Sequence, residues 1–558
     1  MRTWLASVAS LSLALFGCSS SSDSGPGTGP ATAPPEGPAT TSATTTLPRV
    51  PCRFNVPTSL EGSAYECFDV VVPENRSVAG SRTIQVHAIR FHGKAGGTTT
   101  IELNGGPGGP SEDAAMGLAL GVPELKDSLG KFLEVGDYVM FDQRGVGRSI
   151  PRIDCTESEL SLGPVDGGKK CADRWAAKGV DLTGYVTSEN AEDVHDLIVG
   201  LELSRVNLHS ISYGTRLALE ILRRHPTEVA HTIIDGVMPA QAKALTEGDQ
   251  NFDAVFTRIF AACAADAACK AAYPDLEKAL SDVKAKLGKQ PFSLDGMQFG
   301  WDEWSGELMQ NLYADHFAGE VPFLIYDMLD KTAAGFAADM DARMADDQKA
   351  MDDHDALLAS TPLGQEVQKR VAADKDPGAN EMPMGMYLSV VCSDYVQYES
   401  LDEALALEAK VRPVFQSELR VRDTWDGCAP WPKRAKAEGV WAAVTSDRPV
   451  LAVGGAFDPA TPVGWRDLAA ATLTASQKVT MAAGAHGAMD ACAMGFKMSF
   501  LGETPIDASC ASTEAVAFHL PGGAPKKLHA RSLVKGRGAG ARSLPVSPIA
   551  LDLLRRAR

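Results

Sequence analysis

The stretch Arg205-Val206-Asn207-Leu208-His209-Ser210-Ile211-Ser212-Tyr213-Gly214-Thr215 decides the fold of this chain. A short apolar strand leads to Ser212, and a helix-like run from Arg216 to His225 follows it. Strand, serine and helix in this order form a tight elbow that exposes the serine hydroxyl. The turn needs small neighbours, a demand that Gly214 meets fully and Ser210, which is larger than glycine, meets acceptably. Taken alone the pattern is weak, because most serines between small residues cap helices or lie in loops.

Strands and helices alternate regularly around the elbow. Strand-like runs lie at 98–103, 137–141, 229–237, 449–453 and 478–482, and helix-like runs separate most of them. This alternation predicts an α/β fold with a mostly parallel central sheet and helices on both faces. Two further runs, 67–73 and 83–91, are joined by a turn-rich segment and predict an opening hairpin.

The pattern changes between residues 241 and 440. This region is rich in Ala, Leu, Met, Asp and Lys at helical spacing and has little strand signal, which predicts a large inserted helical cap. We therefore expect the core at 51–240 and 441–520, and a basic tail at 521–558. From Lys526 to Arg558, nine Lys and Arg side chains accompany one acidic residue, Asp552. A solvated extension is expected, and contact with anionic envelope surfaces is the alternative.

Composition narrows the class of protein. The 558 residues are 44% hydrophobic and 22% charged, which suits a globular protein with a large core. The formal net charge of −18 argues against a general nucleic-acid binder, because phosphate recognition normally needs a basic surface. No nucleic-acid partner is therefore expected, and the oligomeric state is left open.

The amino-terminal residues 1–18 have the features of an export signal. An apolar run from Trp4 to Phe16 is too short to span a bilayer but has the length of a signal-peptide core. It ends in Leu15-Phe16-Gly17-Cys18, which resembles a bacterial lipobox whose cysteine, Cys18, is lipidated; an ordinary secretory signal is the alternative. Residues 19–50 are rich in Ser, Gly, Pro and Thr and predict a disordered tether. We expect a cell-envelope lipoprotein that contacts the membrane only through its lipid anchor, or else a secreted protein.

The cysteines agree with export. Setting Cys18 aside leaves ten of the 11, and an even number in an exported chain suggests disulfides. Sequence proximity proposes five pairs, although spacing alone does not fix them: Cys52–Cys67, Cys155–Cys171, Cys263–Cys269, Cys392–Cys428 and Cys492–Cys510. No cysteine or histidine cluster has zinc-ligand spacing, so neither a metal nor another cofactor is expected.

Three more signals follow strands of the predicted sheet. The glycine-rich loop 104–110 follows the strand 98–103, Asp458 follows 449–453, and His486 follows 478–482. Because the carboxyl ends of parallel strands meet at one edge of a sheet, we expect all three to lie near Ser212. Few structural explanations place all four features at the same edge.

Serine, aspartate and histidine in this chain order have the arrangement of an α/β-hydrolase triad. In that arrangement His486 removes the proton from Ser212, Asp458 orients the imidazole, and Ser212 attacks a carbonyl to form an acyl-enzyme. We expect the N–H groups of Tyr213 and Gly106 to form the oxyanion hole, each donor contributing roughly 3–4 kcal/mol. The predicted fold is therefore an α/β-hydrolase fold with a large helical cap.

Four motifs also resemble a known family: Asn-Gly-Gly-Pro-Gly-Gly at 104–109, Asp-Gln-Arg-Gly-Val-Gly-Arg-Ser at 142–149, Ser-Tyr-Gly-Thr at 212–215 and Gly-Gly-Ala-Phe-Asp-Pro-Ala-Thr-Pro at 454–462. They are similar to the secreted tripeptidyl aminopeptidases and proline iminopeptidases among the α/β-hydrolases, including their TAP-like C-terminal region. The resemblance runs from about Cys52 to Cys510 and implies removal of short peptides or single residues from free peptide amino termini. Asn104 stands where the iminopeptidases often have histidine, which leaves proline specificity open, and Ser210 replaces the usual glycine or alanine.

An exopeptidase needs a group that binds the substrate ammonium, and Asp394 in the cap is the candidate; a solvated carboxylate is the competing interpretation. Two other functions are compatible with the sequence. The same triad serves an esterase or small-amide hydrolase, because fold and triad do not set specificity. An inactive lipoprotein that binds peptides is the third hypothesis, and the intact Ser212, Asp458 and His486 argue against it.

Overall fold

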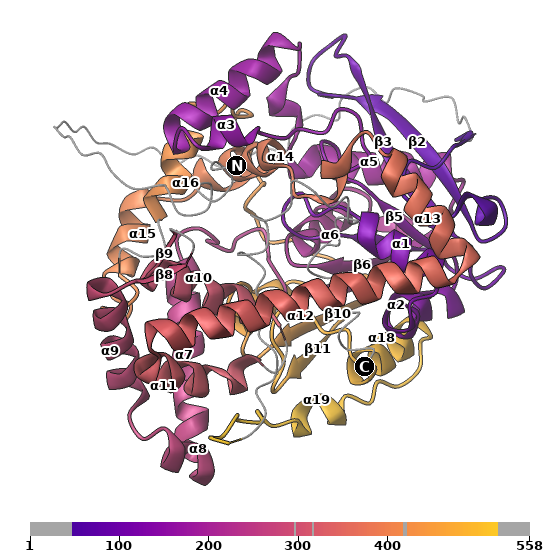
Figure 1. Ribbon diagram of the computed structural model, residues 1–558. Helices are drawn as coiled ribbons and strands as arrows, with labels where there is room; N and C mark the ends of the chain where they lie inside the picture. Colours follow the sequence, from indigo (N-terminus) through magenta and orange to yellow (C-terminus); the bar gives the residue numbers. More distant parts are fainter. Residues whose placement is uncertain (1–46, 295–296, 315–316, 417–420, 523–558) are drawn as a thin grey trace.

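The computed structural model describes residues 47–294, 297–314, 317–416 and 421–522. Its centre is a nine-stranded sheet in the order β1-β2-β3-β5-β4-β6-β7-β10-β11 (Figure 1). The strands β4, β5, β6, β7, β10 and β11 are parallel, and β1, β2 and β3 add an antiparallel edge. Their bounds are β1 Arg49–Val50, β2 Tyr65–Pro73, β3 Thr83–Phe91, β4 Thr100–Leu103, β5 Tyr138–Phe141, β6 Val206–Ile211, β7 Val229–Asp235, β10 Val450–Gly455 and β11 Ser476–Met481.

Helices cover both faces of this sheet. One buried layer joins the sheet to α5, α6 and α17, with Leu197, Leu217 and Ala469 among its members. The other joins it to α1 and α18 through Leu118 and Phe496. The core helices are α1 Glu112–Leu120, α2 Pro123–Asp127, α3 Glu157–Leu160, α4 Pro164–Ala177, α5 Thr187–Gly200, α6 Tyr213–Arg224, α17 Val463–Ala470, α18 Ala491–Leu501 and α19 Ser509–Thr513. The predicted α/β-hydrolase architecture is confirmed.

The region between β7 and β10 is largely helical and has a core of its own, in which Phe252, Phe256, Trp301, Trp304 and Phe415 are buried. Its helices are α7 Gly248–Ala265, α8 Ala267–Ala272, α9 Leu276–Lys289, α10 Trp301–Asn311, α11 Val321–Asp330, α12 Ala333–Ser360, α13 Pro362–Ala373, α14 Met384–Val391, α15 Leu401–Glu408 and α16 Val421–Cys428. The sequence predicts a helical cap with little strand signal, and the structure adds a small hairpin, β8 Phe292–Leu294 with β9 Met297–Phe299.

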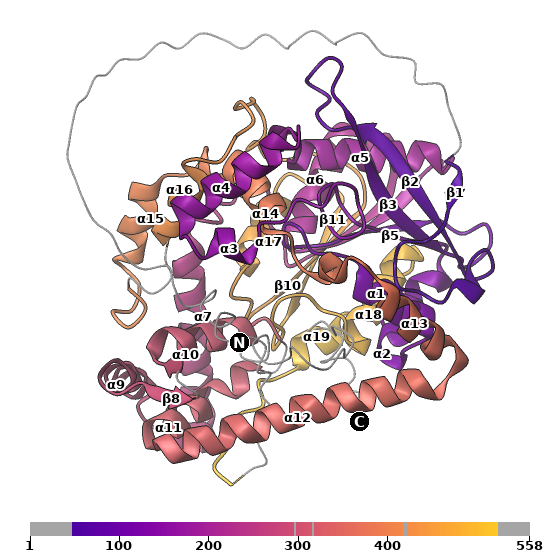
Figure 2. The same cartoon turned by 45° about the horizontal axis from the view of Figure 1, so that its top comes forward.

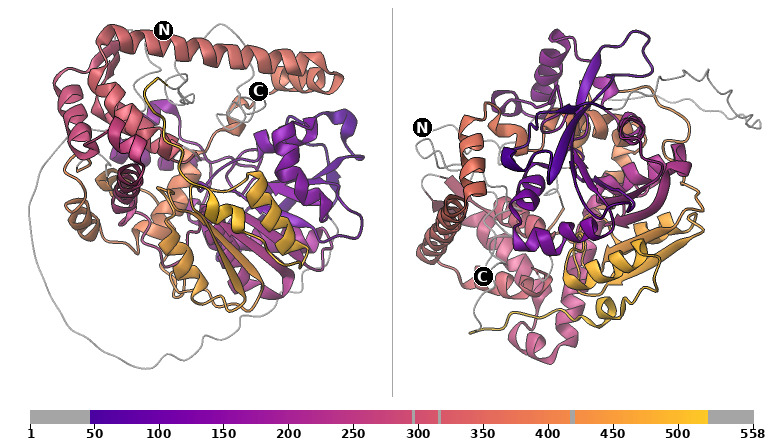
Figure 3. Two further views of the ribbon diagram at one scale, coloured as in Figure 1. Left: turned by 90° about the horizontal axis from the view of Figure 1, so that it is seen from below. Right: turned by 90° about the vertical axis from the view of Figure 1, so that its right-hand side faces the viewer.

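The long helix α12 connects two parts of the molecule. It extends from the group of cap helices α8, α9 and α11 to the edge of the core, where α13 lies (Figures 1 and 3). There Arg370 of α13 donates hydrogen bonds to the carbonyl groups of Cys52 and Phe54. Asp374, just beyond α13, pairs with Arg148 at 2.6 Å. The cap is thus fastened to the core at the far end of α12 as well.

Both ends of the described chain differ from the expected segment boundaries. The sheet already includes Arg49 and Val50, and Leu47 N–H donates to the Gly200 carbonyl at 2.9 Å, so the attachment to the core begins before residue 51. After α19 the chain leaves the core and returns to the cap. His519 there faces Glu320 at 2.7 Å and its carbonyl accepts the Tyr273 hydroxyl. Residues 1–46, with Cys18 and most of the tether, and the basic tail from 523 onward lie outside the described residues.

Five disulfides connect segments of the described chain. They are Cys52–Cys67, Cys155–Cys171, Cys263–Cys269, Cys392–Cys428 and Cys492–Cys510, the same pairs that sequence proximity proposes. Within the described ranges, no helix combines the length and the apolar character that a bilayer crossing requires.

Candidate active site

Ser212 lies at the junction of β6 and α6 in a conformation that few residues adopt. Its φ is 57° and its ψ is −129°, which is strained for a residue with a side chain. A β-carbon on Gly214 would overlap the Leu103 carbonyl oxygen, so only glycine allows α6 to pass the end of β4 this closely. Ser210 fits because its hydroxyl donates to the Ile233 carbonyl of β7 at 2.7 Å. The predicted elbow therefore exists, and the larger Ser210 is held by a hydrogen bond.

Asp458 and His486 form a hydrogen-bonded pair at the ends of β10 and β11. The distance from His486 Nδ1 to Asp458 Oδ2 is 2.9 Å. Asp458 Oδ1 accepts the backbone N–H groups of Ala460 and Thr461, each at 2.8 Å, and Oδ2 accepts the Thr461 hydroxyl at 2.6 Å. The carboxylate is completely buried, so these bonds leave it one orientation.

The end of β7 brings the elbow and the histidine together. Ser212 N–H donates to the carbonyl of Asp235 at 3.0 Å. A β-carbon on the next residue, Gly236, would lie 3.2 Å from His486 Cε1. On the other side, a β-carbon on Gly487 would overlap the side chain of Ile211. The turn that carries His486 is thus packed against the elbow, with glycines at the two points of closest approach.

The pKa of His486 is set by two opposing effects. Burial would lower the pKa, but the Asp458 carboxylate, through its charge and its hydrogen bond, raises the pKa above its ordinary value, and Asp235 contributes in the same direction. Asp235 is itself paired with the fully buried Lys497 at 2.7 Å, and its carboxylate accepts the Ala488 N–H. The buried Asp235–Lys497 ion pair therefore holds the turn that carries His486, through the bond from Ala488.

The glycine loop after β4 lies against the elbow. A β-carbon on Gly105 would lie 2.9 Å from Ser212 Cβ. Gly105 N–H donates to the side chain of Asn104, whose amide group in turn donates to the Pro110 carbonyl. Asn104 therefore braces the loop. Gly106 has a φ of 114°, a conformation that favours glycine.

Tyr213 is the first residue of α6, and the first N–H groups of a helix have no partner within the helix. Its side chain lies fully buried with its hydroxyl 3.0 Å from Thr187 Oγ1. Asp394, in the π-helical turn η7 Cys392–Val396, accepts the Thr187 N–H at 2.8 Å and the Thr187 hydroxyl at 2.6 Å. Its carbonyl accepts hydrogen bonds from Arg216 and Trp441.

These contacts show that Asp394 is a buried carboxylate that accepts hydrogen bonds from Thr187. Only 7% of Asp394 is exposed, and burial raises the pKa of its carboxyl, while Arg216 and the bonds from Thr187 oppose that rise. A solvated carboxylate, the competing interpretation, does not describe this residue. Its contact with a substrate ammonium stays a prediction, and such a contact would involve a carboxylate that already holds Thr187.

The motif at 142–149 is held by buried hydrogen bonds and an ion pair. Asp142 accepts the backbone N–H groups of Ser111 and Arg148, and burial raises the pKa of Asp142 to about 6. Arg144 is fully buried and forms a bidentate pair with Asp193 at 2.6 and 2.7 Å.

Two residues near the triad candidates were not assigned a role from the sequence. Thr461 bonds to Asp458 and lies 3.2 Å from His486 Nδ1; its place in the motif at 454–462, three residues after the aspartate where a side chain can reach back, is the signal that could have indicated it. Tyr313 follows α10 in the cap. Its ring meets the His486 ring edge to face at 4.9 Å, and its carbonyl accepts the His486 N–H at 3.3 Å.

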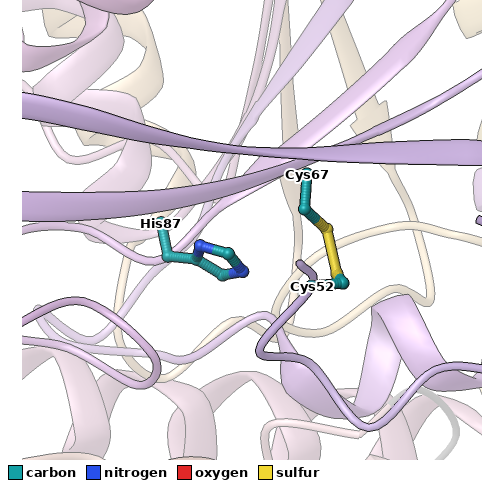
Figure 4. A group of neighbouring side chains, drawn as sticks. All are labelled: Cys52, Cys67 and His87. Carbon is teal, nitrogen blue, oxygen red and sulfur yellow. A yellow bond between two sulfur atoms is a disulfide. The ribbon is translucent and has the colours of Figure 1, made fainter. Parts of the chain in front are cut away.

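Two groups of possible metal ligands are closed by disulfides. In the first, Cys52 and Cys67 are bonded to each other beside the His87 ring (Figure 4). His87 Nε2 accepts the Arg53 N–H and Nδ1 faces Asp69, so both nitrogens are engaged. In the second, Cys155 and Cys171 are also bonded to each other. Neither group offers a thiolate to a metal.

Two parts of the chain match models of known protein families. Residues 105–287, which include Ser212, match the model of the alpha/beta hydrolase fold, and residues 413–510, which include Asp458 and His486, match that of TAP-like protein. The proline iminopeptidase of Xylella fastidiosa is 25% identical over 26% of this chain and 34% of its own length. A Streptomyces coelicolor protein named as a probable proline iminopeptidase is 25% identical over 28% of this chain and 39% of its own.

These matches cover well under half the length of either curated relative. Among solved structures, a hydrolase from Pseudomonas aeruginosa PA01 aligns with 77% of this chain and 96% of its own at 14% identity, with a TM-score of 0.28. The regions that match the two family models both contribute strands to the same mostly parallel sheet. Ser212 lies in the first region, and Asp458 and His486 follow in the second. The chain is an α/β-hydrolase with a TAP-like C-terminal region.

Proposed function

We propose that this chain is an extracytoplasmic serine hydrolase that removes short peptides or single residues from free peptide amino termini through an acyl-enzyme. The observation that carries the proposal is the 2.9 Å contact between His486 and Asp458, placed at the sheet edge where the elbow presents Ser212. Nucleophilic catalysis needs a serine next to an oriented imidazole, and the strained elbow and the Asp458–His486 pair at the same sheet edge support that arrangement here.

In the first step Ser212 Oγ attacks the carbonyl carbon of the substrate while His486 Nε2 accepts the serine proton. Asp458 keeps the other nitrogen, Nδ1, as the proton donor toward Oδ2, and it stabilises the imidazolium that forms. His486 then gives the proton to the departing amine as the peptide bond breaks. Water attacks the resulting ester with His486 again as base, and Ser212 is restored as the acid product leaves.

The negative oxygen of each tetrahedral intermediate needs two donors. Tyr213 N–H is at the positive end of α6, where a developing negative charge is stabilised. The second donor is assigned to Gly106, because Gly105 N–H already donates to Asn104. Each donor is expected to contribute about 3–4 kcal/mol to the stabilisation of the transition state.

The cap supports a peptide substrate of limited length. Side chains of Met382, Pro383 and Met386 lie within 3.3 to 3.9 Å of the place where a β-carbon of Gly108 would stand, so the start of α14 and the residues just before it cover the glycine loop. Tyr313 of the cap covers His486. Cap residues thus pack on both the glycine loop and His486, and such a cover favours chain ends over the middle of a folded protein. The similarity to proline iminopeptidases points to amino termini.

Location outside the cytoplasm is part of the proposal. The five disulfides support it, because such bonds persist in oxidising compartments. Mass spectrometry of the mature amino terminus tests the lipid anchor directly: a diacylglyceryl group on Cys18 is expected, and an unmodified terminus beyond residue 18 contradicts it.

A substrate panel tests the function. Aminoacyl and tripeptidyl chromogenic amides, each with a free or an acetylated amino terminus, are compared with simple esters of the same acyl groups. The proposal expects cleavage of the free amides and a large loss in kcat/KM on acetylation. Equal cleavage of free and blocked substrates excludes an aminopeptidase, and turnover of esters alone assigns the esterase alternative.

Asp394→Asn extends the same panel. If Asp394 binds the ammonium, KM rises for free substrates and stays constant for blocked ones. If it only holds Thr187 behind Tyr213, both kinds of substrate change alike, which removes Asp394 from the binding site.

A further inference from the structure

The chain returns to the cap after its last core helix, α19. This helix is fixed to the core, because its Cys510 is bonded to Cys492 of α18. The carbonyl of Ala511 also accepts the N–H of Ala482, just after β11. Beyond α19, residues 514–519, which we call the strap, run toward the cap helices α8 and α11 (Figures 1 and 2). Because the match to TAP-like protein ends at residue 510, the strap joins core and cap outside the matched region.

The strap is bound to the cap mainly through His519. The side chains of His519 and Glu320 are both buried, and the distance from Nδ1 to Oε2 is 2.7 Å. The imidazole ring is stacked on the ring of Phe323 in α11, with the centroids 4.0 Å apart. The carbonyl of His519 accepts the Tyr273 hydroxyl at 2.8 Å, and Phe518 packs against the cap core. A buried charged contact, a ring stack and backbone bonds therefore hold this segment in one place.

The backbone of the strap lies directly on the short cap turn η5 Phe317–Gly319. His519 N–H donates to the Gly319 carbonyl at 3.1 Å. A β-carbon on Gly319 would lie 2.1 Å from the Ala517 carbonyl oxygen, which is a steric overlap. Only glycine therefore allows the strap to dock here, and a larger residue would push the strap away.

The turn η5 is connected by contacts to the cap residue that lies on the catalytic histidine. Phe317 is buried in the cap core, and its N–H donates to the Ala314 carbonyl at 3.4 Å. Next to Ala314, Tyr313 meets the His486 ring edge to face at 4.9 Å, and its carbonyl accepts the His486 N–H at 3.3 Å. Tyr313 is 37% exposed, whereas the His486 side chain is 7% exposed. The strap thus supports the segment that shields His486 from solvent.

We propose that the docked strap limits the size of the substrates that reach Ser212, because it holds Tyr313 in place over His486. The inference rests on the proposed serine hydrolase function and adds the element that sets substrate length. While the strap is docked, short chain ends enter beside Tyr313. When the strap undocks, the segment of Tyr313 loses its support and longer chains gain access. Arg370 and Asp374 also fasten the cap to the core, so undocking changes the cover and leaves the fold intact.

Two variants of the full chain undock the strap, and a third is the matched control. Gly319→Ala places a methyl group against the Ala517 carbonyl. His519→Gln removes the ring that stacks on Phe323 and still offers Glu320 a polar partner. Gly306→Ala in α10 is the control, because a β-carbon there meets nothing within 4 Å. Far-UV circular dichroism checks that each variant is folded, and His519→Gln decides if Gly319→Ala is not.

Hydrogen exchange measured by mass spectrometry tests the docking. The N–H of His486 is bonded to Tyr313, so exchange in the peptide that contains His486 reports whether the cover is in place. Overpacking in Gly319→Ala should raise the population of undocked strap about tenfold, and exchange at His486 and His519 should rise in proportion. Exchange in β10 should not change, and Gly306→Ala should match the wild type throughout. Unchanged exchange at His486 in both strap variants overturns the proposal.

Labelling of Ser212 tests access, with a small fluorophosphonate and with the same reactive group on a long polymer. The labelling rate of the polymer reagent relative to the small one should rise about tenfold in Gly319→Ala, rise also in His519→Gln, and stay constant in Gly306→Ala. The kcat/KM for a long peptide relative to a tripeptidyl amide should rise in parallel.

The two ratios separate this inference from the proposed function. A polymer ratio that stays constant while exchange at His486 becomes faster overturns the size limit. If no peptide is cleaved but the polymer ratio rises in both strap variants, the size limit is supported and the proposed substrate class is refuted.

Discussion

Asp458→Asn tests the proposed mechanism at the level of single hydrogen bonds. In the native site Oδ1 of Asp458 accepts two backbone N–H groups, from Ala460 and Thr461. An asparagine can keep these bonds only by placing its carbonyl oxygen there. Its NH₂ group then occupies the position of Oδ2 and points at the Thr461 hydroxyl and at His486 Nδ1.

That orientation reverses the tautomer of His486. Nδ1 becomes the acceptor and Nε2 carries the proton, so the imidazole can no longer remove the proton from Ser212. The equivalent change in a serine-protease triad lowers kcat by about 10⁴, which corresponds to about 5.4 kcal/mol of transition-state stabilisation. The fold should survive, because the side chain keeps its shape and two of its bonds.

Steady-state kinetics on the best amide of the substrate panel measure this effect. We expect kcat to fall by about 10⁴ with KM changed little. Thr461→Val is the control, because it removes one bond to Oδ2 and leaves the tautomer of His486 unchanged, so it should cost far less. A decrease of less than tenfold in Asp458→Asn refutes the assignment of Asp458, even if Ser212 proves essential.

Three further predictions concern the same region. Because His486 must be neutral to act as base and its pKa is raised, kcat/KM should fall with decreasing pH along a limb that lies above about 6.5, and a limb at or below that value contradicts the raised pKa. Gly214→Ala should abolish activity and lower Tm, since the new methyl group overlaps the Leu103 carbonyl; wild-type kcat would show that the turn can relax. Lys497→Met leaves the Asp235 carboxylate buried without its partner and should destabilise the protein by about 3–5 kcal/mol in denaturant unfolding, and an unchanged midpoint contradicts this.

The fold was largely predictable because its signals are local. Most of the parallel strands are short, largely apolar runs, and Gly214 marks the turn that no other residue allows. Ser212, Asp458 and His486 each follow one of the parallel strands, so all three lie at the same edge of the sheet.

What could not be predicted depends on contacts between distant segments. The hairpin β8–β9 has strands of three residues, too short to show alternation. The return of His519 to the cap and the pairing of His195 with Glu228 are formed by tertiary packing alone. The setting of Asp394 also depends on packing, because nothing in its own sequence neighbourhood indicates that Thr187 would satisfy it.

Covalent labelling of Ser212 tests the central claim most directly. The folded protein is treated with a fluorophosphonate, digested and analysed by mass spectrometry. We expect a single adduct, on the peptide that contains Ser212, with labelling abolished in Ser212→Ala and strongly slowed in His486→Ala. An unlabelled wild-type protein, or an adduct on another residue that persists in Ser212→Ala, would contradict the claim that Ser212 is the nucleophile.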